Sequence, residues 1–391
     1  MMLASELPGD LDAAARRVVA DGVAPAVSIG AAHRGTAWSS RYGIAGALWP
    51  EGVGPTSPAP AVSRDTVYDL ASLTKPVVAL TLARLERAGS LSRSEPLRDL
   101  LGQAFPDISC TSSADTPLDA LLAHRAGLVA HNPFYEGLVR GERPTLADVL
   151  RAAADMRRSE CVGRCPSDGF TPVYSDLGYL LVGVALAVRT GTPLDELVHR
   201  EVVEPLALSD GEALGAARRL LASGLDSERF APTEVVPWRG GLVRGVVHDE
   251  NAWLLAGDGL AGHAGLFGTV GAVVALGRLV LDAAAGRTAW LSPPELDPLV
   301  RPRPGGTLAA GFDRRSHDAA VTPSSGRRFG HGTFGHLGFT GTSLWLDPAT
   351  DLVGVLLTNR VCPTREHLAI RAARPLVYDA IAAAMLGDAS T

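Results

Sequence analysis

The stretch "GTSLWLDPATDLVGVLLTNR", residues 341–360, decides how this chain folds. Its two halves are rich in residues that favour β-strands, and a turn at Pro348–Asp351 separates them, so the stretch predicts a β-hairpin. Near the other end of the chain, "APAVSIGAAHRG" and "TAWSSRYGIAG" (24–46) carry the same β-rich alternation around a glycine-containing turn. Strands at both ends with helical patterns between them indicate one antiparallel sheet that is built from both termini.

The segment between the two hairpins, from about residue 75 to about residue 285, is dominated by helical patterns that Gly and Pro interrupt. Further helices are expected at the N-terminus, entered through Pro8 and Gly9, and over 365–386, where Pro375 is a kink or a restart. We therefore predict an α/β (α+β) fold, with an antiparallel sheet flanked by helices and a mostly helical inserted region. Residues 1–391 would form a single domain, with a sheet part (about 10–74 and 285–391) and a helical part (about 75–284). A site is expected where the sheet meets the insertion.

Composition restricts the kinds of partner. The net charge is −6, and no basic run appears, so we expect no nucleic acid partner. The N-terminus lacks the basic and apolar regions of a signal peptide, and the longest apolar helical stretch, 177–188, is too short to span a bilayer. We therefore expect a cytoplasmic protein with no membrane partner. The pair Cys161 and Cys165 has no matching second pair, which favours free thiols over a metal site and leaves their pairing open.

Lys75 is the single lysine of the chain, and it stands three residues after Ser72 in "ASLTKPVVAL" (71–80). All the other basic residues among the 36 are arginines. If a helix begins near Ser72, the two side chains lie one turn apart. A serine hydroxyl needs a base to become a nucleophile, and lysine can be that base if its surroundings lower its pKa, whereas arginine cannot. The pair favours catalysis; a surface lysine near a helix start is the alternative.

Two later stretches carry compatible chemistry. Tyr174 begins "YSDLGYLLVGVAL" at the entrance to a predicted buried helix, where its hydroxyl could shuttle a proton beside a lysine. The alternative is a core tyrosine with one hydrogen-bonded end. In "FGHLGFTGTSLWLDP" (334–348), His336 is followed by Gly338 and Gly341, which allow a ligand to approach the backbone. A strand edge here can also offer an N–H group to an oxyanion.

The order S-x-x-K, Y-S-D and H-x-G resembles the serine β-lactamase and penicillin-binding protein superfamily, and most of all its class C β-lactamase-related hydrolases and esterases. The matching residues are Ser72–Lys75, Tyr174–Ser175–Asp176 and His336–Leu337–Gly338. The same group is resembled by "LLAHRAGL" (121–128), "GVVHDENAW" (245–253) and "GHAGLFG" (262–268). The resemblance runs from about residue 20 to about residue 360.

This resemblance implies a β-lactamase/DD-peptidase-like fold and a serine acyl-transfer mechanism. Ser72 would attack a carbonyl to form an acyl-enzyme, Lys75 and Tyr174 would move protons, and water would release the acyl group. The backbone N–H groups of Ser72 and Phe339 would form the oxyanion hole. Substrate contacts would come from Asp176, His336, Gly338 and Thr340. The resemblance implies no metal and no organic cofactor, and its partner is a small-molecule ester or amide.

Three departures from the family pattern bear on the substrate. His336 stands where a lysine often holds a substrate carboxylate, Asp176 replaces a common Asn, and Ala126 replaces a common Ser. A carboxylesterase acting on small esters is therefore the leading hypothesis. A β-lactamase or a peptidase or amidase for D-amino-acid peptides is the first rival. A non-catalytic binding module on the same fold is the second, and the intact Ser72, Lys75 and Tyr174 argue against it.

The remaining histidines and arginines have structural interpretations. His124 is expected to be a structural hydrogen-bonding residue, and for His263 that role is favoured over one in lining the pocket. The spacing of His331 and His336 fits no standard metal site. The arginine pairs are expected at the surface, with Arg327–Arg328 close in sequence to the third motif. The loops 48–64 and 230–247 are expected to control pocket size.

Overall fold

The computed structural model describes residues 9–45, 60–164 and 166–387. The predicted fold class is confirmed: a mixed fold contains an antiparallel six-stranded sheet with the strand order β2-β1-β11-β10-β9-β8. The strands of this sheet are β1 (Ala26–His33), β2 (Thr36–Gly43), β8 (Asp313–Arg314), β9 (Phe334–Leu337), β10 (Ser343–Asp347) and β11 (Leu352–Thr358).

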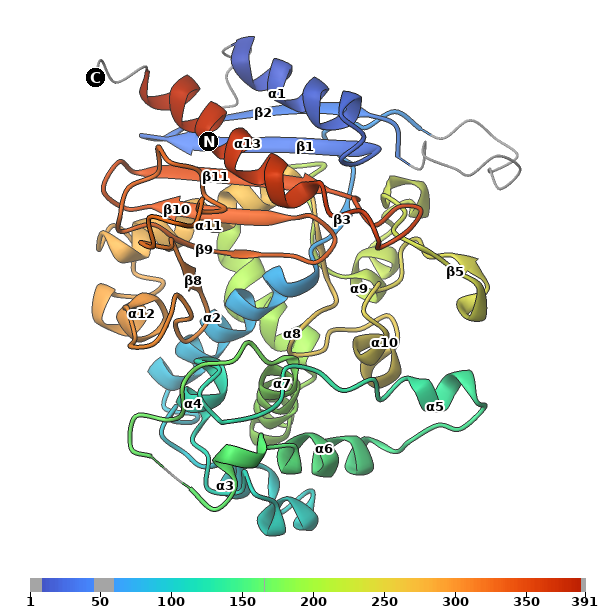
Figure 1. Ribbon diagram of the computed structural model, residues 1–391, viewed down its shortest axis with the longest axis vertical. Helices are drawn as coiled ribbons and strands as arrows, with labels where there is room; N and C mark the ends of the chain where they lie inside the picture. Colours follow the sequence, from blue (N-terminus) through green and yellow to red (C-terminus); the bar gives the residue numbers. More distant parts are fainter. Residues whose placement is uncertain (1–8, 46–59, 165, 388–391) are drawn as a thin grey trace.

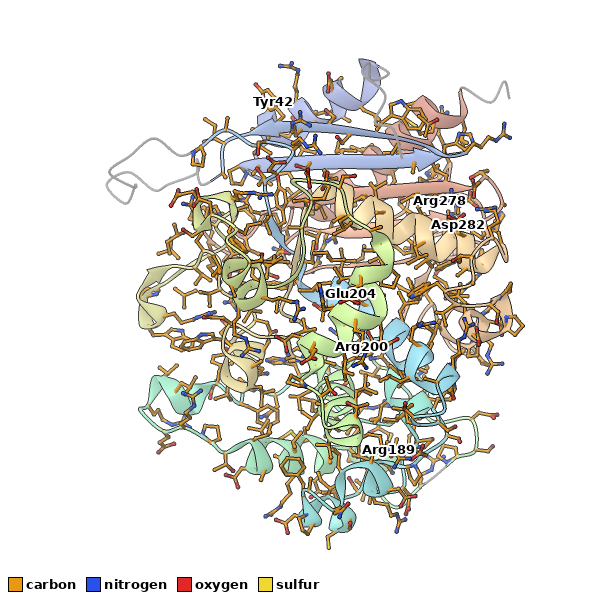
Figure 2. The ribbon with its side chains drawn as sticks, turned by 180° about the vertical axis from the view of Figure 1, so that it is seen from behind. Tyr42, Arg189, Arg200, Glu204, Arg278 and Asp282 are labelled. Atoms are coloured by element: carbon orange, nitrogen blue, oxygen red, sulfur yellow. The ribbon has the colours of Figure 1, made fainter. Side chains whose placement is uncertain are left out.

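The pairing of β1 with β11 joins the two ends of the chain in the middle of the sheet. Ile29 lies opposite Leu356 in this ladder, and both side chains are buried. The predicted C-terminal hairpin is confirmed, with its turn between β10 and β11. Both guanidinium Nη atoms of Arg278 donate to the Asp351 carboxylate of that turn, over 2.9 and 2.6 Å. Figure 2 shows Arg278 beside Asp282 on the same helix, at the end of the sheet.

Helices cover both faces of the sheet. The helices α1 (Gly9–Ala20) and α13 (Ile370–Leu386) lie on one face, with Trp345 and Tyr378 buried beneath them, and α11 (Val270–Ala284) lies on the other (Figure 1). Gly30 allows α11 to come close, because a Cβ there would stand 2.6 Å from Val274 Cγ2. The apolar sandwich that results is the main contribution to the stability of this half.

The helical region lies on the α11 side of the sheet and surrounds α2 (Thr74–Arg87) and α7 (Asp176–Thr190) (Figure 1). Its other helices are α3 (Leu97–Leu101), α4 (Leu118–Leu122), α5 (Glu136–Val139), α6 (Leu146–Asp155), α8 (Leu194–Val198), α9 (Ala217–Ala222), α10 (Glu250–Ala256) and α12 (Pro293–Val300). Short strands pair there as β3 (Tyr68–Asp69), β7 (Leu266–Gly268) and β4 (Leu214–Ala216), and as β5 (Val235–Val236) with β6 (Gly241–Leu242).

Some predicted boundaries need correction. The C-terminal helix begins at Ile370 rather than near 365, and it continues through Pro375. Near the boundary expected at residue 284, α11 packs on the sheet, while α12, beyond that boundary, packs on α2. Pro8, Cys165 and residues 48–59 of the first expected loop lie outside the described residues, and Cys110, Cys161 and Cys362 are free thiols. That the whole chain is a single domain stays a prediction.

Over the described ranges, no individual helix has both the length and the apolarity needed to cross a membrane. The helix α7 passes that test only together with the segment Leu194–Leu206, and the pair is bent by 86°.

Candidate active site

Ser72 lies in a short 3₁₀ turn, Ala71–Leu73, that leads from β3 into α2. Ala71 has a φ of +48°, a left-handed conformation that is unusual for alanine. Its N–H donates to Asp69 Oδ1 over 2.8 Å, which stabilises this conformation. The turn leaves Ser72 partly exposed, and the positive end of the α2 dipole favours negative charge beside it.

Lys75 is completely buried, and the three N–H donors of its ammonium group have three acceptors. Nζ lies 2.9 Å from Ser72 Oγ, 2.7 Å from Asp176 Oδ1 and 3.2 Å from the His263 carbonyl oxygen. Burial lowers the pKa of Lys75, but the Asp176 carboxylate and Tyr174 outweigh it and raise the pKa above its ordinary value. The condition under which Lys75 could serve as the base, a lowered pKa, is therefore not the one that these surroundings favour; they favour the cation, whose Nζ holds the serine oxygen.

Tyr174 stands just before α7, and the Lys75 ammonium lies 4.9 Å from the centre of its ring. The ring also stacks on His124, with the centroids 4.6 Å apart. Burial raises the pKa of Tyr174 above its ordinary value, although the charge of Lys75 and hydrogen bonding to Lys75 and Ser72 oppose this shift. Tyr174 is therefore close enough to Ser72 to exchange a proton with it, beside a cation that stabilises the phenolate.

His336 lies on β9 and faces the same site. Its Nδ1–H donates to the Leu337 carbonyl oxygen over 2.8 Å, which leaves Nε2 as an acceptor. Burial, followed by the charge of Lys75, lowers the pKa of His336 to about 3. The imidazole is therefore neutral near pH 7 and offers no positive charge to a substrate carboxylate.

A cavity of about 340 Å³ joins Ser72 and Tyr174 to His336, Gly338 and Phe339. The Phe339 N–H has no acceptor among the described residues, which suits an oxyanion donor. A Cβ at Gly338 would stand 2.0 Å from Thr342 Oγ1, so the turn requires glycine here. Two larger hollows, of about 480 and 460 Å³, contain none of these residues.

Two of the expected substrate contacts need correction. Asp176 does not line the cavity, because its carboxylate pairs with Lys75 and lies 3.7 Å from His131 Nδ1. Thr340 is 1% exposed, and its hydroxyl donates to the Asp69 carbonyl oxygen over 2.7 Å, so it ties the Phe339 turn to β3. Both residues hold the site together from behind.

Three arginines that the sequence analysis did not select line the cavity: Arg360, Arg371 and Arg374. The spacing of Arg371 and Arg374 on one helix face was the available signal. The arginine pair near the third motif, Arg327–Arg328, does not line this cavity. Its backbone N–H groups donate to the Asp379 carboxylate of α13.

The remaining histidines have defined partners. His124 Nδ1 accepts from the Ser175 N–H over 3.0 Å, in agreement with the expected structural role. His263 Nε2 lies 2.9 Å from Asp249 Oδ1. His331 stacks on His317 rather than meeting His336.

A serine at a helix entrance, bonded to a buried lysine beneath an antiparallel sheet, defines a serine hydrolase of the β-lactamase fold. The sequence model of the family described as Beta-lactamase matches residues 11–378, and the chain belongs to that family. Expectations from the three motifs are thereby confirmed at the level of family and fold.

Known relatives and solved structures are similar to this chain over most of its length. An N-acetylmuramyl-L-alanine amidase of Bacillus subtilis (strain 168) is 29% identical, over 75% of this chain and 68% of the relative. A protein of Escherichia coli (strain K12), provisionally named a D-alanyl-D-alanine carboxypeptidase, is 28% identical over 75% and 69%. The structure of EstCE1, a hydrolase with promiscuous acyltransferase activity, covers 94% of this chain and 98% of its own, with 18% identity and a TM-score of 0.66. A class C β-lactamase from Rhodobacter sphaeroides covers 95% and 99%, with 17% identity and a TM-score of 0.64.

Replacing the buried lysine by arginine tests the geometry around Lys75. Lys75→Arg keeps the charge, but the larger planar guanidinium cannot occupy a site built around three acceptors of one ammonium. We expect kcat to fall by about 10²-fold or more, close to the loss in Lys75→Ala. Arg84→Lys on the same helix, at a 26% exposed ion pair, is the control and should stay near wild type. A Lys75→Arg enzyme within a few-fold of wild type would contradict this.

Removing the Asp176 charge tests the origin of the pKa shifts. Asp176 raises the pKa values of both Lys75 and Tyr174, so both should fall in Asp176→Asn. If catalysis needs deprotonated Tyr174 and protonated Lys75, the acid limb of the pH profile follows the pKa of Tyr174 and the alkaline limb follows the pKa of Lys75. A fall in both pKa values therefore moves both limbs to lower pH. We expect both limbs of the kcat/KM profile to move down by about one pH unit or more. Asp195→Asn, at the Arg218 ion pair outside the cavity, is the control; an upward or absent shift in Asp176→Asn would refute the assignment.

Proposed function

We propose that this chain is a carboxylesterase that forms an acyl-enzyme on Ser72 and acts on small esters. The observation that carries the proposal is the hydrogen bond from Lys75 Nζ to Ser72 Oγ, 2.9 Å long. Because the serine oxygen accepts this bond, its own hydrogen is free to be donated to Tyr174.

The arrangement supports a two-step reaction. Ser72 Oγ bonds to the ester carbonyl carbon while its proton passes to Tyr174 in its phenolate form, which is the minor form near neutral pH because burial raises the pKa of this tyrosine. The N–H groups of Ser72 and Phe339 stabilise the oxyanion. Tyr174 then gives the proton to the alcohol as the C–O bond breaks. Water attacks the acyl-enzyme, gives a proton to Tyr174, and Ser72 regains it when the acid leaves. Lys75 remains protonated throughout and stabilises the phenolate.

Esters are favoured by the neutral and apolar parts of the cavity. His336 is uncharged near neutral pH, and Leu308, Leu368 and Ile370 contribute apolar surface to the lining. A short acyl or alkyl group buried against them gains about 0.8 kcal/mol per CH₂.

A second candidate substrate carries a free carboxylate, as β-lactams and D-amino-acid peptides do. The supporting observation is the group Arg360, Arg371 and Arg374 in the cavity lining. Burial, with the like charges of Arg360 and Arg371, lowers the pKa of Arg374 to about 10, and its Nε is buried without a partner among the described residues. In the part of the chain that the structure describes, no carboxylate comes within salt-bridge range of these three guanidinium groups. The relatives named as an amidase and a carboxypeptidase favour the same candidate.

Acylation of Ser72 tests the proposal directly. Wild-type enzyme is expected to hydrolyse short-chain nitrophenyl esters with a higher kcat/KM than a chromogenic cephalosporin. After treatment with a fluorophosphonate, intact-protein mass spectrometry should show one adduct, which peptide mapping assigns to Ser72. Ser72→Ala should lose both the adduct and at least about 10³-fold in kcat, because no other nucleophile is activated there.

Ser175→Ala is the matched control for that experiment, since Ser175 Oγ donates to the Val129 carbonyl oxygen instead of lining the cavity. An adduct that persists in Ser72→Ala would overturn the proposal, and a cephalosporin cleaved faster than every ester would replace it by the β-lactamase rival.

A matched pair of substrates tests the arginines. Nitrophenyl acetate is neutral, whereas the mono-nitrophenyl ester of succinate adds a carboxylate to a similar acyl group. In Arg371→Gln we expect KM for the succinate ester to rise about tenfold, from loss of one charged hydrogen bond, with less than twofold change for acetate. Arg140→Gln, at a surface arginine that is 61% exposed, should change neither value. Equal effects on the two esters would exclude carboxylate recognition by Arg371.

A further inference from the structure

The sequence HDEN, His248–Asn251, belongs to the motif GVVHDENAW (245–253), and none of its residues has a role in the mechanism proposed above. We call these four residues the HDEN segment. It lies at the start of α10 and outside the cavity lining; His248, Glu250 and Asn251 are buried, and the Asp249 side chain is 27% exposed. Each member reaches a different part of the site: His248 meets Asp69, Asp249 meets His263, Glu250 meets Arg365, and Asn251 donates to Asn132, next to His131.

The main chain of His248 is bonded to the turn that holds the nucleophile. Its N–H donates to Asp69 Oδ2 over 2.7 Å, while Asp69 Oδ1 accepts from the Ala71 N–H over 2.8 Å. One carboxylate thus fixes both His248 and the left-handed residue before Ser72. Thr340 donates to the carbonyl oxygen of the same aspartate, so the Phe339 turn joins this point too.

The side chain of His248 contacts the other oxyanion donor. Its imidazole stacks on the Phe339 ring, with centroids 5.8 Å apart and planes 19° apart. The Arg360 guanidinium lies 4.5 Å from the centre of the same ring, and its Nε donates to the Phe339 carbonyl oxygen over 2.8 Å. Phe339 is itself 49% exposed and belongs to no strand, so His248 and Arg360 supply the ring contacts that add to the bond from Thr340 in holding its turn.

The imidazole of His248 is in turn fixed by a buried acid. Nε2 lies 2.9 Å from Glu234 Oε2, and the Glu234 carboxylate also accepts from Arg365 Nε, over 2.6 Å. Burial raises the pKa of Glu234, but hydrogen bonds from His248 and Arg365 outweigh it and lower the pKa to about 2. The His248 imidazole that stacks on Phe339 is therefore held in one orientation by an anionic partner, the Glu234 carboxylate.

We propose that His248 is a positioning residue that aligns the two oxyanion donors, the Ser72 N–H through Asp69 and the Phe339 N–H through ring stacking. This inference rests on the proposed acyl-enzyme mechanism, because the two donors have an oxyanion to stabilise only if Ser72 attacks the carbonyl carbon. His248 itself is assigned no contact with the substrate. Such donors act only when they lie about 2.7–3.1 Å from the developing oxyanion, so a small movement of the Phe339 turn weakens the transition state more than the bound substrate.

Two substitutions separate positioning from stability. His248→Gln keeps a hydrogen bond to Glu234 but removes the ring, whereas His248→Phe keeps the ring and leaves Glu234 without that partner. His248→Phe should therefore give the lower Tm, because a buried carboxylate loses a donor. If the ring positions Phe339, His248→Phe nevertheless gives the higher kcat. We expect His248→Gln to lower kcat about 10- to 100-fold with less than a threefold change in KM, and His248→Phe to recover most of that loss.

The readouts are kcat and KM for a short-chain nitrophenyl ester, the rate of Ser72 labelling by a fluorophosphonate, and Tm. In the labelling reaction the serine oxygen bonds to phosphorus, fluoride leaves, and the serine proton passes to Tyr174. Because the phosphoryl oxygen gains negative charge as an ester carbonyl oxygen does, it uses the same N–H donors of Ser72 and Phe339. His199→Gln is the matched control, because His199 also pairs with a glutamate, its Nε2 lying 3.4 Å from Glu204 Oε1, but this pair lies outside the site. It should leave the rates unchanged.

A double-mutant cycle gives an independent test that does not need a stable His248→Phe. Phe339→Ala removes the exposed ring on which His248 acts, so adding His248→Gln to it should cost less than twofold further in kcat. Fully additive losses, activities that follow Tm with His248→Gln above His248→Phe, or unchanged labelling rates would each overturn the role of His248. Wild-type enzyme that is not labelled at Ser72 would instead overturn the acyl-enzyme mechanism, and the inference with it.

Discussion

The ion pair between Lys75 and Asp176 is the contact on which the rest of the site depends. An ammonium group with no exposure to solvent needs an anion and a full set of acceptors, and breaking such a pair costs about 3–5 kcal/mol. The acceptors come from the turn before α2, from the start of α7 and from the loop before β7. Elements that are far apart in the sequence are therefore held at fixed distances by the demands of one cation.

The same pair determines the proton chemistry. An isolated buried lysine would lose its proton readily and serve as a base. Here the Asp176 carboxylate raises the pKa of Lys75, and in the proposed mechanism Tyr174 is the group that exchanges a proton with Ser72.

The features that the sequence predicted are those governed by local periodicity. The alternation in 341–360 and 24–46 was sufficient for both hairpins, and the i, i+3 spacing of Ser72 and Lys75 was sufficient for their contact. The strands β8 and β9, with two and four residues, are too short to carry a pattern. The packing of α11 on the sheet could not be predicted, because a helix that is apolar on most sides does not reveal its neighbour. The pairing of Asp176 with Lys75, the meeting of Arg360 with Arg371 and Arg374, and the contacts of His248 depend on which distant segments meet, and no spacing in the sequence encodes that.

The ladder between β1 and β11 also constrains the order in which the molecule can fold. The Ala26 N–H donates to Asn359 Oδ1, 333 positions further along the chain. Contacts at such separation form late, because closing a long loop costs entropy before any contact compensates for it. On the ribosome, the β1–β2 hairpin therefore waits with one edge unpaired until β11 has been made. Ser72 lies between these ends, so a chain still in synthesis has its nucleophile but not the β9–β10 turn that would activate a substrate. Catalysis thus becomes possible only when the last hairpin closes the sheet.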